Sequence, residues 1–374
     1  MADNRNIFEE VGEKQAAPIV KAAKAEPRRA IIIWLGILFA MLLAMIAIGG
    51  LTRLTDSGLS ITEWKPITGT IPPLSAADWD VEFAKYQESP EFLLQNHAMS
   101  LEDFKGIFWW EWGHRFLGRM IGLVWAIGFF WFWARKQIPT GYTSKFLGLG
   151  VLGGLQGALG WWMVSSGLTG RMVDVASYRL ALHLGLAFII LGLITWYVLS
   201  LRKTGAEILQ ARRRREGGLM AFSTVLLWVL FVQILLGGLV AGIDAGRSFP
   251  TWPDMAGEFL PSESFGYEPL WSNFFENPAL VQFNHRLMGY IAFVLGLGLW
   301  WKARRSPVAT TRGAFSVMAV MMLAQVVLGI FTVLYLAPLD IALTHQMGAV
   351  ALFVLAIRAR FHAAYPAEQK IARG

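Results

Sequence analysis

The sequence predicts an all-α polytopic membrane protein, with eight transmembrane helices arranged as two parallel-repeat four-helix bundles. The chain of 374 residues is 55% hydrophobic and only 16% charged, whereas soluble domains carry about 25% charged residues. Eight apolar runs have the length of ~20 residues that a helix needs to cross a bilayer. The last four runs also repeat motifs of the first four.

The eight expected helices are separated by loops of very different length. They fall at 31–51, 107–134, 144–166, 178–201, 220–243, 279–301, 314–336 and 340–361. Ser100-Leu101-Glu102-Asp103 precedes the second run and resembles a capping box, which starts a helix. Little more than Ala337-Pro338-Leu339 separates the last two runs, so we expect them to form a tight hairpin.

Lysine and arginine are distributed asymmetrically between the two sets of loops. They concentrate in both tails and in the loops after the second, fourth and sixth helices, whereas the long loops at about 52–106 and 244–278 are acidic. Positive residues stay on the cytoplasmic side, so both termini are expected there. We expect a tail at 1–30, a bundle at 31–201, a basic linker at 202–219, a second bundle at 220–361 and a tail at 362–374. The first tail has no apolar stretch near its start, unlike a cleaved signal.

Motifs of the first half return in the second half in the same order. Gly49-Gly50-Leu51 returns as Gly237-Gly238-Leu239, Asp56 as Asp244, Trp64 as Trp252, His114-Arg115 as His285-Arg286, Gln156 as Gln325, and His183 as His345. Four helices per unit is an even number, so both halves have the same orientation in the membrane.

Composition excludes several classes of function. The net charge of +7 lies mainly in short loops, which is the pattern that orients membrane helices and does not indicate nucleic-acid binding. The chain has no cysteine, which excludes disulfides, thiolate ligands, iron–sulfur clusters and a cysteine nucleophile.

Four of the six histidines lie near the outer ends of alternate helices: His114, His183, His285 and His345. A buried polar side chain in lipid is costly without a partner. One such histidine is more often a packed core residue, but four at matched positions favour ligation. Facing pairs inside helix bundles suit axial ligation of haem iron, with two histidines per haem. Carboxylate or thiol clusters that would indicate another metal are absent from the pattern.

The two halves differ three residues before the first histidine of each pair. Glu111 precedes His114, whereas Gln282 precedes His285. This spacing places each side chain on the same helix face as its histidine. A carboxylate there accepts protons or stabilises a cation, which favours chemistry in the first half and an electron-transfer haem in the second. The alternative is an interface glutamate paired with Arg115 or Arg119.

Arginines and glycines near the outer helix ends have candidate roles. Guanidinium groups pair well with carboxylates, so the candidates for binding haem propionates are Arg53, Arg115, Arg171, Arg247 and Arg286. The alternative is ordinary anchoring at the membrane interface. The Gly-Gly pairs at 49–50 and 237–238 are expected to allow close helix approach.

Glu111-Trp112-Gly113-His114-Arg115, with the three later histidines and the duplicated Gly-Gly-Leu, resembles haem A synthase. The chain is similar to the cysteine-free class, related to the alphaproteobacterial and mitochondrial enzymes, so a thiol relay is excluded. The resemblance implies oxidation of the C8 methyl of haem O to a formyl group by successive hydroxylations, giving haem A for cytochrome oxidase. It implies that Glu111 is the catalytic carboxylate. It further implies that His114, His183 and Arg115 bind the substrate haem, and that His285, His345 and Arg286 bind a haem b cofactor.

The resemblance also implies a multi-pass protein of the bacterial inner membrane, with haem sites toward the periplasmic side. Its expected partners are haem O as substrate, the lipid bilayer, haem O synthase and an electron acceptor in the membrane. One alternative is a diheme b-type electron-transfer protein, in which both haems are permanent. Another is a transporter built on parallel repeats, which would place its polar sites at the midplane.

Overall fold

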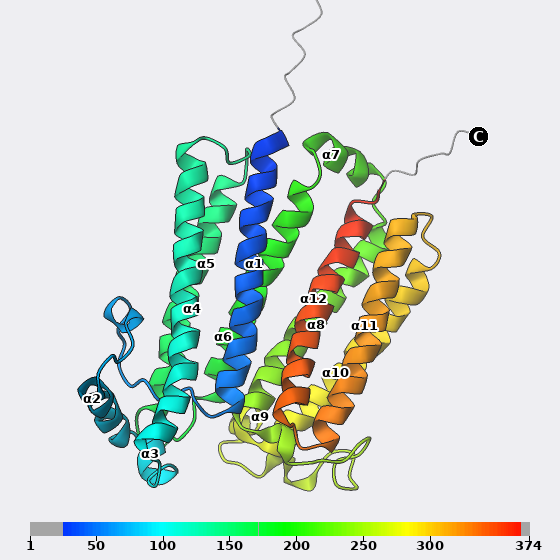
Figure 1. Ribbon diagram of the computed structural model, residues 1–374. Coiled ribbons are helices and arrows are strands. Elements are labelled where there is room, and N and C mark those ends of the chain that lie inside the picture. The colour runs from blue at the N-terminus through cyan, green and yellow to red at the C-terminus, as the bar shows by residue number, and fades with distance from the viewer. Residues whose placement is uncertain (1–24, 171, 368–374) are drawn as a thin grey trace, which may run out of the picture.

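The computed structural model describes residues 25–170 and 172–367. The expected tail at 1–30 therefore lies mostly outside the described residues, as do Arg171 and the end of the second tail. Within the described ranges the regular elements are all helices, and no strand occurs. Figure 1 shows the long helices running side by side, with short helices and loops gathered at both ends.

Eight long helices match the eight expected apolar runs. They are α1 (Ala25–Leu54), α4 (Leu101–Ala134), α5 (Thr143–Gly167), α6 (Ser177–Leu201), α8 (Gly217–Gly242), α10 (Pro278–Ala303), α11 (Ala309–Leu334) and α12 (Leu339–Ala364). Seven described helices are long and apolar enough to cross a membrane. The eighth, α10, has 26 residues like its neighbours, but Gln282, Asn284, His285 and Arg286 make its first turns polar. The all-α polytopic fold is thus confirmed.

The short helices were not expected from the sequence. They are α2 (Ala76–Gln87), α3 (Pro90–Leu94), α7 (Gly205–Arg213) and α9 (Asn273–Glu276), with 3-10 turns at Thr68–Thr70, Ala245–Arg247, Ser262–Phe265 and Leu270–Ser272. Helices this short leave too few turns for an apolar period to be recognised. Local caps still define some of them, since Ser75 and Asp78 form a capping box at the start of α2.

Equivalent helices pack in equivalent ways in the two halves. The contacts α1–α4, α4–α5, α5–α6 and α1–α6 correspond to α8–α10, α10–α11, α11–α12 and α8–α12. The halves meet where α6 packs on α8, α12 on α1, and α6 on α12. Small residues allow the α6–α8 approach: a Cβ at Gly238 would lie 3.0 Å from Cα of Ala181, and one at Gly242 would lie 2.7 Å from Cα of Ser177.

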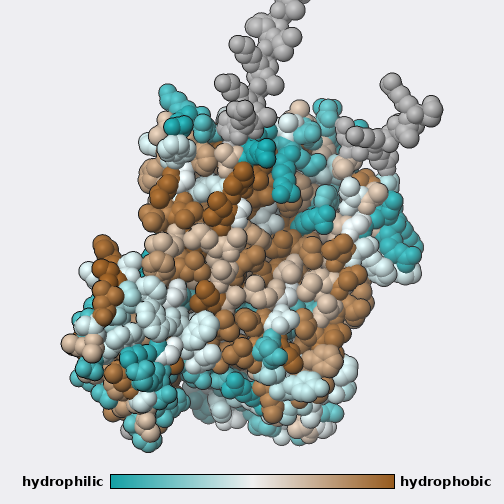
Figure 2. Space-filling view, viewed as in Figure 1, coloured by the Kyte–Doolittle hydropathy of each residue, from teal (hydrophilic) through white to brown (hydrophobic). Residues whose placement is uncertain are grey.

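The interior and the exterior of the helical region are both apolar. Fully buried Leu35, Phe188, Leu191 and Phe315 belong to one continuous core that spans both halves. Figure 2 shows apolar residues across the middle of the visible face and polar residues toward its two ends. An exposed apolar band between polar ends is the surface that a bilayer covers.

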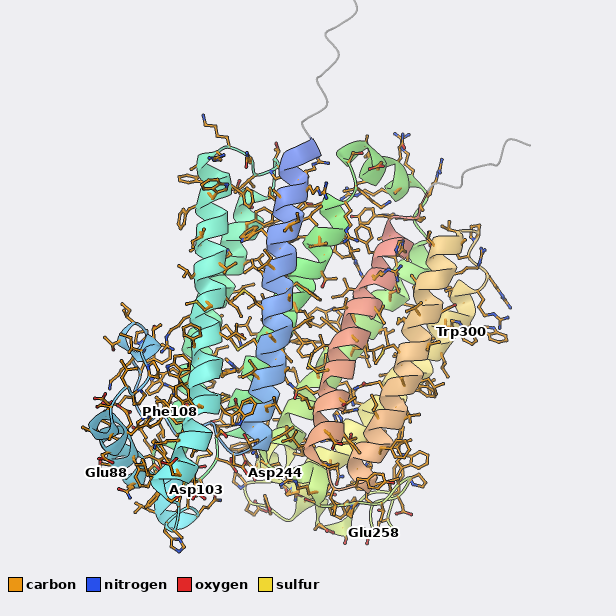
Figure 3. The ribbon with its side chains drawn as sticks, in the orientation of Figure 1. Glu88, Asp103, Phe108, Asp244, Glu258 and Trp300 are labelled. Carbon is orange, nitrogen blue, oxygen red and sulfur yellow. The ribbon has the colours of Figure 1, made fainter. Side chains whose placement is uncertain are left out.

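The expected capping box at the start of α4 is confirmed. Ser100 accepts from the Asp103 N–H, and the Asp103 carboxylate accepts from Ser100. The first turns of α4 pack against α2, where the rings of Trp79 and Phe108 lie 5.0 Å apart; Figure 3 labels Asp103 and Phe108 there. His114 therefore lies further into its helix than the other three histidines, which corrects the expectation of matched depth within the helices.

One arginine joins the two halves at their outer ends. Arg53 on α1 forms ion pairs with Asp56 at 2.7 Å, Asp244 at 2.8 Å and Asp174 at 3.7 Å. Asp56 and Asp244 are repeat-equivalent, and both have left-handed backbone angles, with φ of 48° and 52°. Figure 3 shows Asp244 beside the outer end of α1. Arg53 is thus engaged by three aspartates, while its buried Nε has no hydrogen-bond partner among the described residues.

Candidate functional site

The histidine pair of the second half is brought together by α10 and α12. The ring centroids of His285 and His345 lie 6.5 Å apart, with the rings nearly perpendicular at 81°. An imidazole nitrogen binds a metal at about 2 Å, so this separation leaves room for one metal ion between two ligating rings. Among the described residues, the buried Nδ1 of His285 has no hydrogen-bond partner.

The pair of the first half also faces across its bundle. His114 comes from α4 and His183 from α6, the equivalents of α10 and α12. Both helices pack against α1, as α10 and α12 both pack against α8. Each half therefore presents one pair of imidazoles toward the same end of the molecule.

Every one of the four histidines lies against a glycine of the neighbouring helix. A Cβ would lie 3.2 Å from His114 at Gly49, 3.0 Å from His183 at Gly160, 3.1 Å from His285 at Gly237 and 3.0 Å from His345 at Gly329. A side chain at any of these positions would push the ring aside. The expected role in helix approach holds for Gly238, whereas Gly49 and Gly237 make room for histidines. The sequence also repeats Gly160 as Gly329, together with Gln156 and Gln325, but it does not show that these glycines lie against the histidines.

Glutamines hold three of the four imidazoles. Nε2 of Gln156 lies 3.1 Å from Nδ1 of His183, and Nε2 of Gln325 lies 3.1 Å from Nδ1 of His345. Both amides also donate to the backbone carbonyl of their histidine, at 2.9 and 2.7 Å. A contact to the ring nitrogen that does not bind metal orients a histidine ligand. The duplicated Gln156 and Gln325 had been noticed in the sequence, but their contact with the histidines had not.

The fourth histidine lacks such a glutamine. Gln233 on α8 lies 3.3 Å from Nε2 of His285, but its repeat-equivalent on α1 is Met45. The two side chains occupy matching places: Gln233 lies 3.3 Å from a Cβ at Gly289, and Met45 lies 3.5 Å from a Cβ at Gly118. His114 therefore has a thioether where His285 has an amide.

Glu111 is buried and fully hydrogen-bonded, with only 3% of its surface exposed. Oε2 accepts from the Ser60 hydroxyl at 2.7 Å and the Ile61 N–H at 2.8 Å. Oε1 accepts from Nε and Nη2 of Arg115 at 3.0 and 2.6 Å. Four donor atoms, two of them on the Arg115 guanidinium, therefore surround the carboxyl group. The ion pair with Arg115, which belongs to the alternative interpretation of Glu111, is present at 2.6 Å, and Glu111 joins α4 to the outer loop.

The repeat-equivalent arginines hold the outer loops over both histidine pairs. Arg115 donates to the carbonyls of Ile61 at 2.8 Å and Glu63 at 3.0 Å. Arg286 donates to the carbonyls of Phe249 at 2.7 Å and Asp254 at 2.9 Å. Every N–H-bearing nitrogen of Arg115 is therefore already engaged by Glu111 or the loop.

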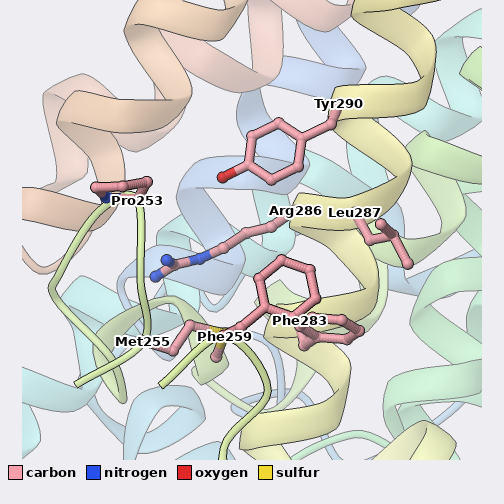
Figure 4. A pocket seen from close by; sticks show the side chains of 7 residues that line it. All are labelled: Pro253, Met255, Phe259, Phe283, Arg286, Leu287 and Tyr290. Carbon is pink, nitrogen blue, oxygen red and sulfur yellow. The ribbon is translucent and has the colours of Figure 1, made fainter. Parts of the chain in front are cut away.

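Arg286 is less completely engaged than Arg115. It lines a small pocket with Pro253, Met255, Phe259, Phe283, Leu287 and Tyr290. Figure 4 shows its guanidinium extending toward the loop that carries Pro253, one helical turn from Tyr290. Gln282 donates to the same Phe249 carbonyl at 3.2 Å. In the second half the Gln282 amide therefore donates a hydrogen bond to the outer loop, whereas in the first half the Glu111 carboxylate accepts hydrogen bonds from it.

The fold and the site define a class of protein: a polytopic helical membrane protein whose two repeated halves each hold a pair of inward-facing histidines. A model of the COX15-CtaA family, described as cytochrome oxidase assembly protein, matches residues 32–357. The chain belongs to this family, and the expected resemblance is confirmed.

Full-length relatives agree with this assignment. "Heme A synthase" of Dinoroseobacter shibae is 57% identical over 373 residues, covering 98% of this chain and 97% of the relative. The protein of the same name from Paracoccus denitrificans is 56% identical, with 98% of each chain covered. That of Ruegeria pomeroyi is 54% identical, again with 98% of each chain covered.

Proposed function

We propose that this protein is a haem A synthase, which oxidises the C8 methyl of haem O to a formyl group by successive hydroxylations and so supplies haem A to cytochrome oxidase. The observation that carries the proposal is full-length similarity, at 57% and 56% identity, to proteins named "Heme A synthase". The duplicated histidine pairs supply the ligands that such chemistry needs.

The second half has a donor set that fits a resident haem. Two imidazoles 6.5 Å apart, glycines that leave space beside each ring, and an unpartnered buried ring nitrogen among the described residues suit axial ligation of one iron. His285 and His345 would hold a haem b, and Arg286 would face its propionates. Such a haem supplies one-electron transfer. We assign this role to the second half because its residue beside the pair is the neutral Gln282.

The first half would bind the substrate. His114 and His183 would hold haem O through its iron, with the methyl group near Glu111. With water as the source of oxygen, each hydroxylation of the methyl carbon releases two protons and passes two electrons to the acceptor, and Glu111 is a buried carboxylate three residues before His114. Its oxygens already accept four hydrogen bonds. Proton uptake by Glu111 therefore requires at least one donor, from Arg115 or the loop at 60–61, to withdraw.

The protein would lie in the bacterial inner membrane with both termini in the cytoplasm and both haem sites toward the periplasm. The asymmetric distribution of lysine and arginine supports this orientation. Its partners would be a haem O synthase, which makes its substrate, and an electron acceptor in the same membrane.

Identifying the extracted pigments tests the proposal. The protein is expressed in a host that makes haem O, purified, and its haems are identified by mass. Haem B together with haem O or haem A supports the enzyme. Haem B alone, at two per chain, would instead establish a diheme electron-transfer protein, which the placement of the two histidine pairs on repeat-equivalent helices allows.

A further inference from the structure

The loop between α1 and α2 carries an exposed apolar tip. The segment 66–75 has no charged residue, and its side chains Ile67, Ile71 and Leu74 are 83%, 68% and 79% exposed. Figure 1 shows this loop rising beside the middle of α4, on the side away from the other helices. In Figure 2 the tip of this projection is apolar.

Exposed tryptophans mark where the bilayer crosses α4. Trp109 and Trp110 are 46% and 41% exposed near one end, and Trp131 and Trp133 are 53% and 57% exposed near the other. Tryptophan favours the two membrane–water interfaces. At ~1.5 Å per residue, Trp110 and Trp131 are about 32 Å apart, which matches the ~30 Å hydrocarbon thickness. Arg119 lies about 13 Å inside the outer tryptophans on the same scale.

Arg119 holds the loop at its own depth in the membrane by hydrogen bonds. Its Nε donates to the carbonyl of Pro66 and its Nη2 to the carbonyl of Lys65, both at 2.9 Å. An arginine within the bilayer is stable only when it pairs, often with backbone carbonyls. The loop therefore satisfies Arg119, and Arg119 holds the loop inside the level of the outer tryptophans.

Most backbone N–H groups of the segment are absent or hydrogen-bonded, whereas those of Ile67 and Thr68 have no partner among the described residues. Its prolines at 66, 72 and 73 have no N–H to satisfy. The N–H groups of Gly69, Thr70 and Ile71 donate to carbonyls within the turn, and those of Leu74 and Ser75 donate to the Asp78 carboxylate. Only a backbone with satisfied donors enters lipid without a large cost.

The charges that flank the segment are paired with one another. The ammonium group of Lys65 lies 2.6 Å from Glu63 and 3.7 Å from Glu82. Glu63 and Glu82 also pair with Lys85 at 2.8 Å each. These charges form one paired cluster against α2.

We propose that the segment 66–74 is a membrane-inserted loop, whose side chains Ile67, Ile71 and Leu74 lie among the acyl chains of the outer leaflet. The lipid-facing surface of α4 continues beside it, with Leu123 and Ile127 50% and 62% exposed. Insertion anchors the outer loop that, through Ser60 and Ile61, binds Glu111. The inference does not depend on which reaction the protein catalyses.

Site-directed spin labelling tests the proposal directly, because the chain has no cysteine and a single introduced thiol is labelled uniquely. Ile71→Cys and, separately, Leu74→Cys carry a nitroxide in the full-length protein in lipid nanodiscs. Two matched controls have equal exposure: Leu93→Cys on α3 and Ile127→Cys on α4, each 62% exposed. Collision rates with oxygen, which concentrates in lipid, and with a water-soluble nickel chelate are measured.

We expect the labels at 71 and 74 to behave like the label at 127, with an oxygen-to-nickel ratio several-fold above that at 93. A ratio equal to that at 93 would place the loop in water and overturn the proposal. Low accessibility to both reagents, or spin–spin broadening between chains, would show that protein covers the tip and would overturn it equally.

Discussion

Glu111 is the side chain by which the two histidine sites differ most in chemistry. Glu111→Gln keeps an acceptor for the Ile61 N–H but removes the charge that pairs with Arg115. We expect the variant to fold, to bind haem at both sites, and to accumulate haem O or its hydroxylated intermediate while haem A falls. Loss of one such electrostatic group typically costs ~10²–10³ in rate. Mass analysis of haems extracted from whole membranes measures the effect.

The control for this substitution is Glu102→Gln, because Glu102 is an exposed glutamate on the same helix that pairs only with Lys105. It should make haem A at the parent rate. If Glu111→Gln does so too, the carboxylate serves only to fasten the outer loop.

The two sites also differ at one equivalent position, which is Met45 in the first half and Gln233 in the second. This difference predicts that the two halves lose haem at different rates. A hydrogen-bond partner of a histidine ligand contributes about 10–100-fold in metal affinity. Gln233→Met should therefore speed haem loss from the second half, and Met45→Gln should slow it from the first. Transfer of haem to apomyoglobin measures both rates. Met45→Leu, which adds no amide, should leave the rate unchanged, and an equal effect of leucine and glutamine would exclude the hydrogen bond as the cause.

The sequence indicated which residues form the candidate site but not how they are held. The four histidines could be found because polar side chains are rare in apolar runs. The duplicated Gln156 and Gln325 and the glycines at 160 and 329 were part of the same repeats, yet their contacts with the rings depend on helix rotation, which periodicity in an all-apolar helix does not define. The full engagement of Arg115 depends on the path of the loop at 60–63, and a single sequence does not reveal that path.

At the scale of elements, the helix pair α2–α3 contains a buried acid outside the membrane-spanning region. Glu91 is 3% exposed, and burial, together with the charges of Glu111, Asp174 and Asp56, raises its pKa to about 8. The folded protein therefore binds this proton more tightly than the unfolded chain does. The resulting stability is complete below the ordinary glutamate pKa and is lost as pH rises through about 8.

Glu91→Gln should remove this pH dependence. The melting temperature of the parent in detergent should fall between about pH 5, just above the ordinary glutamate pKa of ~4.3, and a pH above about 8, whereas that of the variant should change less. Glu88→Gln, at an exposed neighbour in the same segment, should melt like the parent. Parallel curves for all three proteins would show that Glu91 is not protonated in the folded state.

The helices that could be predicted from the sequence are those long enough to span a membrane. The eight long helices follow from apolar runs because few other structures satisfy so many backbone groups in lipid. The helices α2, α3, α7 and α9 were missed, since they lie in polar loops where capping residues such as Ser75 provide the only signal. The first turns of α4 precede the apolar run at 107–134, and only the capping box at Ser100 indicates them in the sequence.

At the scale of the whole molecule, the prediction of cytoplasmic termini and periplasmic long loops is tested by reporter fusions. A reporter that is active only in the periplasm should be silent when fused after Gly374 and active when fused after Asp254 in the outer loop. The charge distribution between the loops is the physical reason. Activity after both Asp254 and Gly374 would mean an even number of crossings between them instead of three, and would remove α10, the most polar of the eight long helices, from the set that spans the membrane.

The ion pairs of Arg53 make the two halves of the molecule depend on each other. Two identical halves related by a two-fold axis would make every contact twice, but Arg53 has no counterpart: the equivalent position is Ala241. The aspartates of both repeats, Asp56 and Asp244, converge on this single cation. A second arginine would have to share the same space. The halves are therefore not interchangeable, and two copies of the second half alone would bring together two Asp244 carboxylates whose arginine partner is Arg247, at 3.7 Å, rather than a shared Arg53.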